Sequence, residues 1–158
     1  MPQIKESITI NRPISETFRY ATNFNTSPEW QPDVQSVHQS EDKPRPGVMV
    51  TQNRKTYMMG TKLDLNADII DYNLNHFMEY KGVLGKFPAR GRLSFESGGG
   101  VTTVTETIDI RMGFFYAIFS PFMLRTMSRR TRTALEGLKQ RLESRSAATV
   151  TSYQDELS

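Results

Sequence analysis

Cysteine is absent from the 158-residue chain, which excludes disulfide bonds, thiolate catalysis and zinc sites built on cysteine. Histidine is scarce: His38 and His76 are the only two, so a metal centre with several histidine ligands is excluded as well. A chain of this size needs no such staple, because folding hides roughly 70% of the unfolded surface. We therefore expect no metal and no cofactor, and we expect both histidines to be exposed residues at strand ends rather than bases.

Long apolar runs are missing too. The N-terminus has no apolar segment behind a basic start, so no signal peptide is predicted and a soluble, cytoplasmic protein is expected. Residues 112–124 are the most apolar, but they fall short of the about 20 residues that a membrane-spanning helix needs and include Pro121. The net charge is only +3, so no nucleic-acid partner is predicted. Basic residues cluster once, at Arg125, Arg129, Arg130 and Arg132, where a solvated helix face is expected.

The hydrophobic periodicity predicts one strand, two short helices and then six more strands. Residues 3–10 alternate with isoleucine on one face, Pro13 begins a helix, and Ser27 to Trp30 form a further helical turn. The later strands are separated by turns rich in glycine and asparagine, which is typical of an antiparallel meander. We predict these strands at residues 34–40, 48–57, 61–72, 77–81, 87–96 and 101–111, with residues 82–85 in a turn.

The period changes to that of a helix from about residue 116 to 145. The stripe that predicts this helix recurs every three or four positions: Met127, Thr131, Ala134, Leu138 and Leu142. Residues 147–158 are polar and are expected to form a flexible tail behind a single domain of residues 1–146. The predicted fold class is α+β, a curved seven-stranded antiparallel sheet around one long C-terminal helix. One cylinder cannot fill a concave sheet, so this arrangement leaves space between the two.

Two segments carry a resemblance to a known family. ITINRPISETFRYATNFNTSPEWQPDVQSV, an apolar strand running into a proline-started helix and a Pro-x-Trp turn, resembles the opening of START-like (helix-grip, SRPBCC) proteins. RRTRTALEGLKQRLES resembles the Leu-Lys-x-x-Leu-Glu ending of their long helix. The likeness covers about residues 3–145 and is to the branch named for polyketide cyclases and dehydrases. It implies a helix-grip fold with a hydrophobic cavity between sheet and helix, in a family of carriers, receptors and a few enzymes.

Carboxylates in phase with apolar strand residues are the candidate functional groups, because a buried carboxylate is costly unless it is paired. Glu6, Glu79 and Glu106 have this placement, and each is expected at the sheet's rim or beside a cationic side chain. Arg54, which shares a face with Gln52, is the expected internal partner for one of them. The two could equally orient the polar end of a ligand.

The predicted ligand-binding residues combine these polar groups with apolar neighbours: Trp30, Val50, Gln52, Arg54, Leu65, Ala67, Ile69, Phe77, Glu79, Leu93, Glu106, Ile108, Met123 and Met127. Three functions stay open, and so does the oligomeric state. The first is non-catalytic binding or carriage of a small hydrophobic molecule, a lipid or a polyketide-like compound. The second is an enzyme of the cyclase/dehydratase kind, with Glu106 as general acid or base and Arg54 polarising a carbonyl. The third is an interaction module that meets a protein or an anionic membrane through residues from Phe114 to Arg132.

Overall fold

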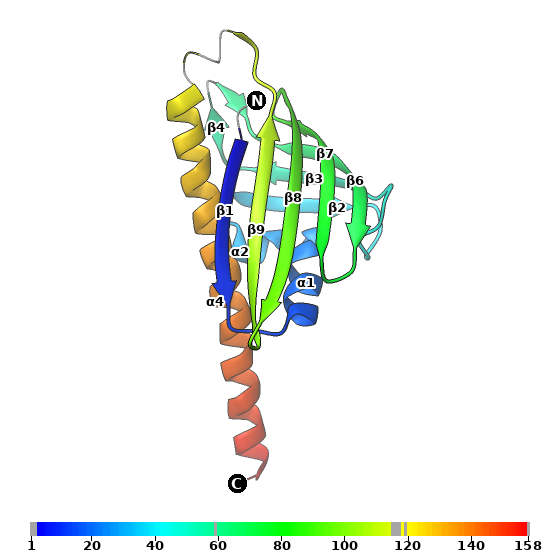
Figure 1. Cartoon of the computed structure of the whole chain (residues 1–158), viewed down its shortest axis with the longest axis vertical. Coiled ribbons are helices and arrows are strands. Elements are labelled where there is room, and N and C mark those ends of the chain that lie inside the picture. The colour runs from blue at the N-terminus through cyan, green and yellow to red at the C-terminus, as the bar shows by residue number, and fades with distance from the viewer. Residues whose placement is uncertain (1–2, 59, 115–117, 119, 158) are drawn as a thin grey trace.

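The structure is a computed structural model that describes residues 3–58, 60–114, 118 and 120–157 (Figure 1). Its elements along the chain are β1 Gln3–Ile10, α1 Ile14–Thr22, the 3₁₀ helix η1 Phe24–Thr26, α2 Ser27–Trp30, β2 Val34–Gln39, β3 Met49–Arg54, β4 Tyr57–Met58, β5 Thr61–Lys62, β6 Leu65–Asn73, β7 Phe77–Leu84, β8 Phe87–Gly98, β9 Val101–Ile110 and α4 Ser120–Leu157.

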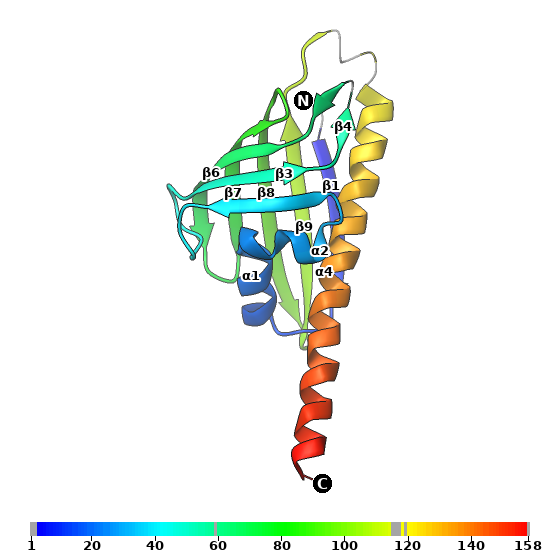
Figure 2. The ribbon, with the colours of Figure 1, turned by 180° about the vertical axis from the view of Figure 1, so that it is seen from behind.

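Seven of these strands form one antiparallel sheet in the order β1-β9-β8-β7-β6-β3-β2. The helices α1 and α2 lie between β1 and β2 in the chain and on the same side of the sheet in space (Figure 2). The long helix α4 runs along the sheet beside β1 (Figure 1). The predicted α+β helix-grip architecture is confirmed, including its seven strands and the position of its short helices.

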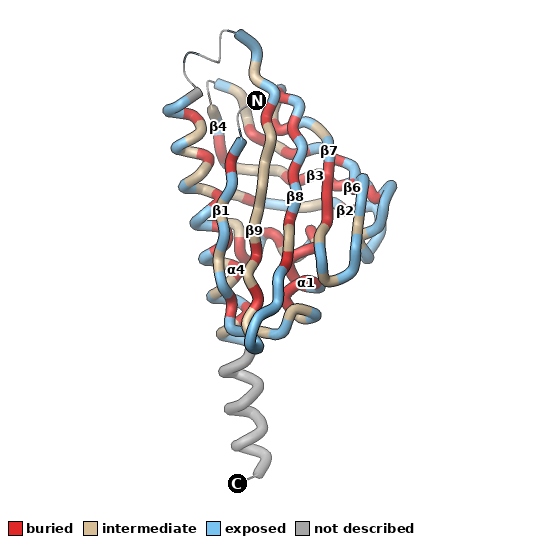
Figure 3. The backbone as a smooth tube through the Cα atoms, in the orientation of Figure 1, coloured by how far each residue is buried: buried red, intermediate tan, exposed pale blue. Residues whose placement is uncertain are grey.

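The hydrophobic core lies between the concave face of the sheet and these helices. Buried and exposed residues alternate along β8, as the tube coloured by burial shows (Figure 3). The apolar stripe of α4 supplies Leu135, Leu138 and Leu142, each exposed by 1% or less. A leucine buried this fully contributes about 1.5–3 kcal/mol of transfer free energy, so the stripe anchors the helix to the sheet. None of the described helices is long and apolar enough to cross a membrane.

The structure corrects three predicted boundaries. The turn predicted at residues 82–85 is shorter, because β7 continues to Leu84. Gly82 lies within this strand, where its lack of a side chain matters because a Cβ would lie 1.9 Å from the carbonyl oxygen of Asn66. The strands predicted at 48–57 and 61–72 are interrupted by the small hairpin of β4 and β5. Strand β3 ends at Arg54. The backbone N–H of Arg54 donates to a side-chain oxygen of Asp64 at 2.7 Å rather than to a neighbouring strand.

The end predicted for the last helix, near Arg145, is also wrong. The backbone stays helical to Leu157, so that the last turns extend beyond the sheet (Figures 1 and 2). The polar composition of residues 147–157 argued for a tail, but nothing in it breaks a helix that is already propagating, since each added residue gains a hydrogen bond. The predicted start near residue 116 lies outside the described residues. The division into a domain of residues 1–146 and a tail stays a prediction.

A glycine lets α4 approach α2 closely. A Cβ on Gly137 would lie 2.3 Å from the carbonyl oxygen of Trp30. The contact is reinforced by Arg141, whose Nε donates to the carbonyl oxygen of Glu29 at 3.0 Å. The residues that follow α2, Gln31 to Asp33, are thereby held beside the middle of the long helix, where they border the cavity described below.

Replacing Gly137 by alanine should destabilise the fold even though alanine is the better helix former. Helix propensity alone would favour alanine by about 1 kcal/mol. The new methyl group must instead push the backbone of Trp30 away, and overpacking of this kind costs about 1–3 kcal/mol. We expect a net fall in the free energy of urea-induced unfolding. Glu136→Ala, at an exposed neighbouring position of α4, is the control. Stabilisation by Gly137→Ala would show that the two backbones are not in contact.

Candidate functional site

A cavity of about 380 Å³ lies between the concave face of the sheet and α4. Sites for small molecules in proteins span roughly 300–1,000 Å³, so this one has the size for a compact ligand. Its apolar wall consists of Pro32, Leu63, Leu65, Tyr80, Leu84, Ala89, Ile108, Met127 and Ala134. Its polar wall consists of Gln31, Asp33, Arg54, Thr56, Glu106, Thr126, Arg129, Arg130, Thr131 and Thr133.

The structure brings part of the predicted residue set together around this cavity. The predicted residues that line it are Arg54, Leu65, Glu106, Ile108 and Met127. Gln52 lies directly behind Arg54 and is fully buried. Other predicted residues are buried in the core without lining the cavity: Trp30, Val50, Ala67, Ile69, Leu93 and Met123.

The reason for this division is that α1 and η1 fill the rest of the concave face with aromatic rings. The ring of Phe18 packs 4.8 Å from that of Phe95 and 5.4 Å from that of Tyr72, measured between centroids. The ring of Phe24 meets Tyr80 edge to face at 5.8 Å. This end of the sheet is therefore packed core, and the cavity lies where α4 and the residues after α2 cover the sheet.

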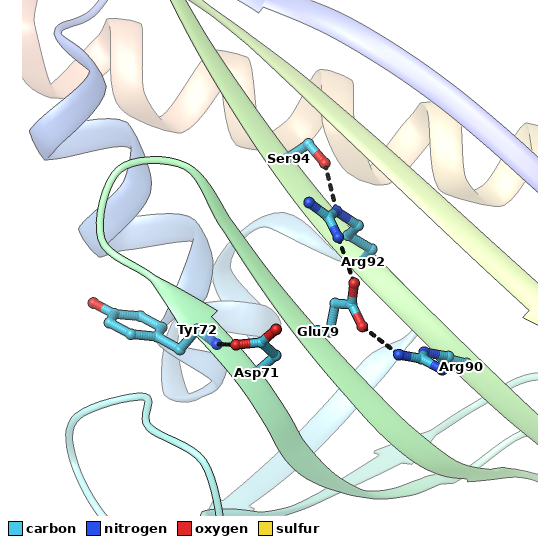
Figure 4. Close-up of polar contacts among 6 residues, drawn as sticks. All are labelled: Asp71, Tyr72, Glu79, Arg90, Arg92 and Ser94. Carbon is cyan, nitrogen blue, oxygen red and sulfur yellow. Dashed lines mark hydrogen bonds and ion pairs between the residues drawn. The ribbon is translucent and has the colours of Figure 1, made fainter.

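Phe77 and Glu79 are corrections to the predicted set, because both lie on the outer face of the sheet. Met78 and Tyr80 point into the core, so the alternation of β7 turns their neighbours outward. Glu79 accepts hydrogen bonds from Arg90 at 2.7 Å and from Arg92 at 2.5 Å (Figure 4).

These contacts hold the pKa of Glu79 below its usual value, first through the hydrogen bond from Arg90. Glu6, on β1, is paired in a similar way with Ser128 and Arg132 of α4, and its pKa is also lowered, first by the hydrogen bond from Ser128. The expectation of cationic partners is confirmed for both glutamates. Both histidines are exposed, as predicted.

Glu106 differs from these two carboxylates, since it lines the cavity and is half-buried there. Tyr80, which also lines the cavity, and Arg54 are the polar residues that affect its ionisation. Burial raises the pKa of Glu106, against the opposing effects of the positive charge on Arg54 and of the Tyr80 hydrogen bond. The pKa of Tyr80 is raised as well, mainly by burial and then by the charge of Glu106. The environment of Glu106 therefore shifts its ionisation equilibrium toward the protonated form relative to an ordinary glutamate.

Gly91 makes the contact between Tyr80 and Glu106 possible. It occupies β8 between the strands that carry those two residues, directly opposite Tyr80. A Cβ on Gly91 would lie 2.1 Å from Cζ of Tyr80 and 2.3 Å from its hydroxyl oxygen. The tyrosine ring thus lies across the missing side chain and extends toward β9. Sequence reasoning missed both Tyr80 and Gly91, although a glycine inside a strand pattern is a signal of such close approach.

Arg54 is held by neutral groups. One of its terminal nitrogens, Nη2, donates to Oε1 of Gln52 at 2.8 Å and to Oε1 of Gln31 at 3.4 Å. Gln52 in turn donates to the hydroxyl of Ser27 on α2 at 2.9 Å. The Nε–H of Arg54 is buried and has no hydrogen-bond partner among the described residues.

Arg130 of α4 is hydrogen-bonded to two other residues that line the cavity, Asp33 and Thr56. Its Nη1 donates to Oδ2 of Asp33 at 2.8 Å and to Oγ1 of Thr56 at 2.5 Å. Its Nε–H, like that of Arg54, is buried without a partner among the described residues. The arginines at 125–132 had been interpreted as a solvated helix face. The missed signal is spacing: Arg130 stands three residues after Met127 and four before Ala134, on the inward stripe.

The described residues contain no group of three or more acidic or histidine side chains placed to hold a metal ion. The cavity combines an apolar wall with three arginine side chains and a carboxyl group whose pKa is raised by burial. This combination can bind an apolar body and orient one polar end of it.

Comparison with known proteins gives a family and a fold. The family described as polyketide cyclase/dehydrase and lipid transport matches residues 1–143. None of the curated proteins compared with the chain matches its sequence.

Among solved structures, TTHA0849 from Thermus thermophilus is 17% identical, with a TM-score of 0.77 over 92% of this chain and 99% of that one. A START superfamily protein from Mycobacterium smegmatis is 13% identical, with a TM-score of 0.71 over 90% and 97%. The di-domain ARO/CYC BexL from the BE-7585A biosynthetic pathway is 16% identical, with a TM-score of 0.67 over 88% of this chain and 49% of that one.

The contrast between Glu106 and Glu79 predicts opposite effects of pH on stability. The pKa of Glu106 in the folded state lies above its usual value of 4.5, so between the two values the folded protein binds more protons than the unfolded chain. The free energy of unfolding therefore falls as pH rises through this window. Glu106→Gln removes that penalty, and its stability relative to wild type should increase as pH rises above about 4.5.

Glu79→Gln is the matched control of opposite sign. The folded-state pKa of Glu79 lies below 4.5, so its contribution to stability is complete above that pH and is lost as pH falls through the folded-state value. This variant should be less stable than wild type at neutral pH, and the deficit should shrink on acidification. Urea unfolding at a series of pH values measures both. If the stability difference from wild type changed with pH in the same way for both variants, the conclusion that burial raises the pKa of Glu106 would be contradicted.

Proposed function

The chain belongs to the polyketide cyclase/dehydrase and lipid transport family, and from this premise we propose that it binds a small, largely apolar molecule as a non-catalytic carrier or binding protein. The observation that supports the proposal is the cavity of about 380 Å³ between sheet and α4. Its wall is apolar along Leu65, Ile108 and Met127, where a bound molecule would be removed from water at a gain of about 25 cal/mol per Å² of apolar surface.

An enzymatic role is the second candidate, and the raised pKa of Glu106 is what favours it. A carboxyl group with a raised pKa is a candidate general acid, and Arg54 could polarise a carbonyl oxygen nearby. The carrier function ranks first because it needs only the geometry described. Catalysis needs in addition a reacting atom held within hydrogen-bond reach of Glu106.

The wall residue Met127 offers a direct test of binding in the cavity. A fluorescent naphthalene-type or fatty-acid probe should bind with one site per chain. Met127→Trp replaces a thioether chain in the cavity wall by a bulkier indole ring. The variant should weaken probe binding by about tenfold or more, which corresponds to about 1.4 kcal/mol. Met49→Trp, at a position that is 62% exposed, is the control and should leave the affinity unchanged. Equal affinities for the two folded variants would place the probe elsewhere.

A membrane-surface contact, through which a lipid could enter or leave, is part of the proposal. Three large apolar side chains near the start of α4 are exposed: Phe114 by 84%, Ile118 by 70% and Phe122 by 76%. Arg111, Arg125 and Arg129, also exposed, supply positive charge around them. Apolar side chains beside cations fit the interface of an anionic bilayer.

This contact predicts binding to anionic vesicles that weakens with salt. Co-sedimentation with phosphatidylserine-containing vesicles should exceed that with phosphatidylcholine vesicles. It should fall as salt rises, because the Debye length shrinks from about 10 Å at 0.1 M to about 3 Å at 1 M. Phe122→Ser should reduce binding, whereas Leu74→Ser, at an exposed residue between β6 and β7, should not. Equal binding to both kinds of vesicle, or none, would remove the membrane from the proposal.

A further inference from the structure

Charge is distributed unevenly around the cavity. Three arginines line it, Arg54, Arg129 and Arg130, against two carboxyl groups, Asp33 and Glu106. Asp33 is already engaged by Arg130 in an ion pair of 2.8 Å. The hydrogen bonds of Arg54 go to the amide oxygens of Gln52 and Gln31, which carry no charge. The cavity is therefore positive before anything enters it.

The guanidinium groups of Arg54 and Arg130 belong to residues that both line the cavity. Both arginines are fixed by other bonds, Arg54 through Gln52 and Arg130 through Asp33 and Thr56, so neither needs to be rebuilt to receive a ligand. Donors fixed in advance bind with little loss of side-chain entropy.

We infer that the molecule bound in this cavity carries a carboxylate, which Arg54 and Arg130 hold at the polar wall while the apolar body lies along Ile108 and Met127. The inference rests on the proposed function and names the class of ligand, a small aliphatic or aromatic acid. A carboxylate has two acceptor oxygens and one negative charge, which match the planar set of donors and the positive charge of a guanidinium group. An alcohol brings a donor of its own and no charge, so it matches less well. Because burial raises the pKa of Glu106, this residue repels a nearby carboxylate less than an ordinary glutamate would.

The volume of the cavity also limits the size of the carboxylic acid that it can bind. About 380 Å³ is near the lower end of the range for small-molecule sites. This volume suits one acyl chain or a few fused rings, and it does not suit a two-chain phospholipid with its headgroup.

The test compares decanoate with 1-decanol, which share a chain and differ in the polar end. Calorimetry or displacement of the naphthalene-type probe gives the two affinities for the wild-type protein at neutral pH. We expect decanoate to bind about tenfold tighter or more, as charge-assisted hydrogen bonds predict. Equal affinities, or a preference for the alcohol, would overturn the carboxylate while leaving the proposed function standing. If neither compound binds and the probe does not bind either, the proposed function itself fails.

Variants then assign the preference to the two arginines. Arg54→Gln and Arg130→Gln, each checked for folding by circular dichroism, should lose the tenfold preference for decanoate and keep the affinity for decanol. Arg92→Gln, an arginine on the outer face of the sheet, is the matched control and should keep the preference. A preference that survives in both folded cavity variants would show that the carboxylate is bound elsewhere.

Discussion

A helix packs against a sheet along a narrow stripe. Here α4 packs against the edge strand β1 and against the short helix α2. The concave face is wider than that stripe. Near β7 and β8, the rings of Phe18 in α1 and Phe24 in η1 fill it, so that region behaves as ordinary core. The part of the concave face that lies between the α4 contact and the aromatic rings is not covered by side chains, and this part forms the cavity. Atoms that line a void forfeit van der Waals contacts on one side, and a bound apolar molecule restores them.

Three glutamates on similar strand patterns acquire different chemistry from their neighbours. Glu6 and Glu79 meet arginines directly and keep their charge at low cost. Glu106 lies in the cavity wall, where burial raises its pKa against the opposing effects of Arg54 and Tyr80. Gly91 decides this outcome, because any side chain there would displace the ring of Tyr80. The chemistry of the site therefore depends on a missing side chain as much as on the groups that are present.

The sequence predicted the architecture well, because strand and helix periods are local properties. It placed β1, α1 and α2 and the inward stripe of α4 correctly. It failed on the face of β7, where Phe77-Met78-Glu79-Tyr80 has an apolar residue in both phases, so that alternation alone cannot choose.

The candidate site was harder to predict than the fold. Val50 and Ile69 are as buried and apolar as Leu65, and only the placement of α1 and α4 decides which of them borders open space. Arg130 was missed for the opposite reason: a charge was assumed to face solvent, whereas its stripe position turns it toward Asp33.

The central claim is that a ligand occupies the space between β9 and α4, and contacts between ligand and protein methyl groups test it most directly. In protein with ¹³C-labelled methionine and isoleucine methyls, a bound aliphatic acid should give intermolecular nuclear Overhauser effects to Met127 and Ile108, which line the cavity. It should give none to Met49 or Ile70, which are exposed on the sheet. Effects confined to the exposed methyl groups, with Met127 and Ile108 silent, would contradict the account.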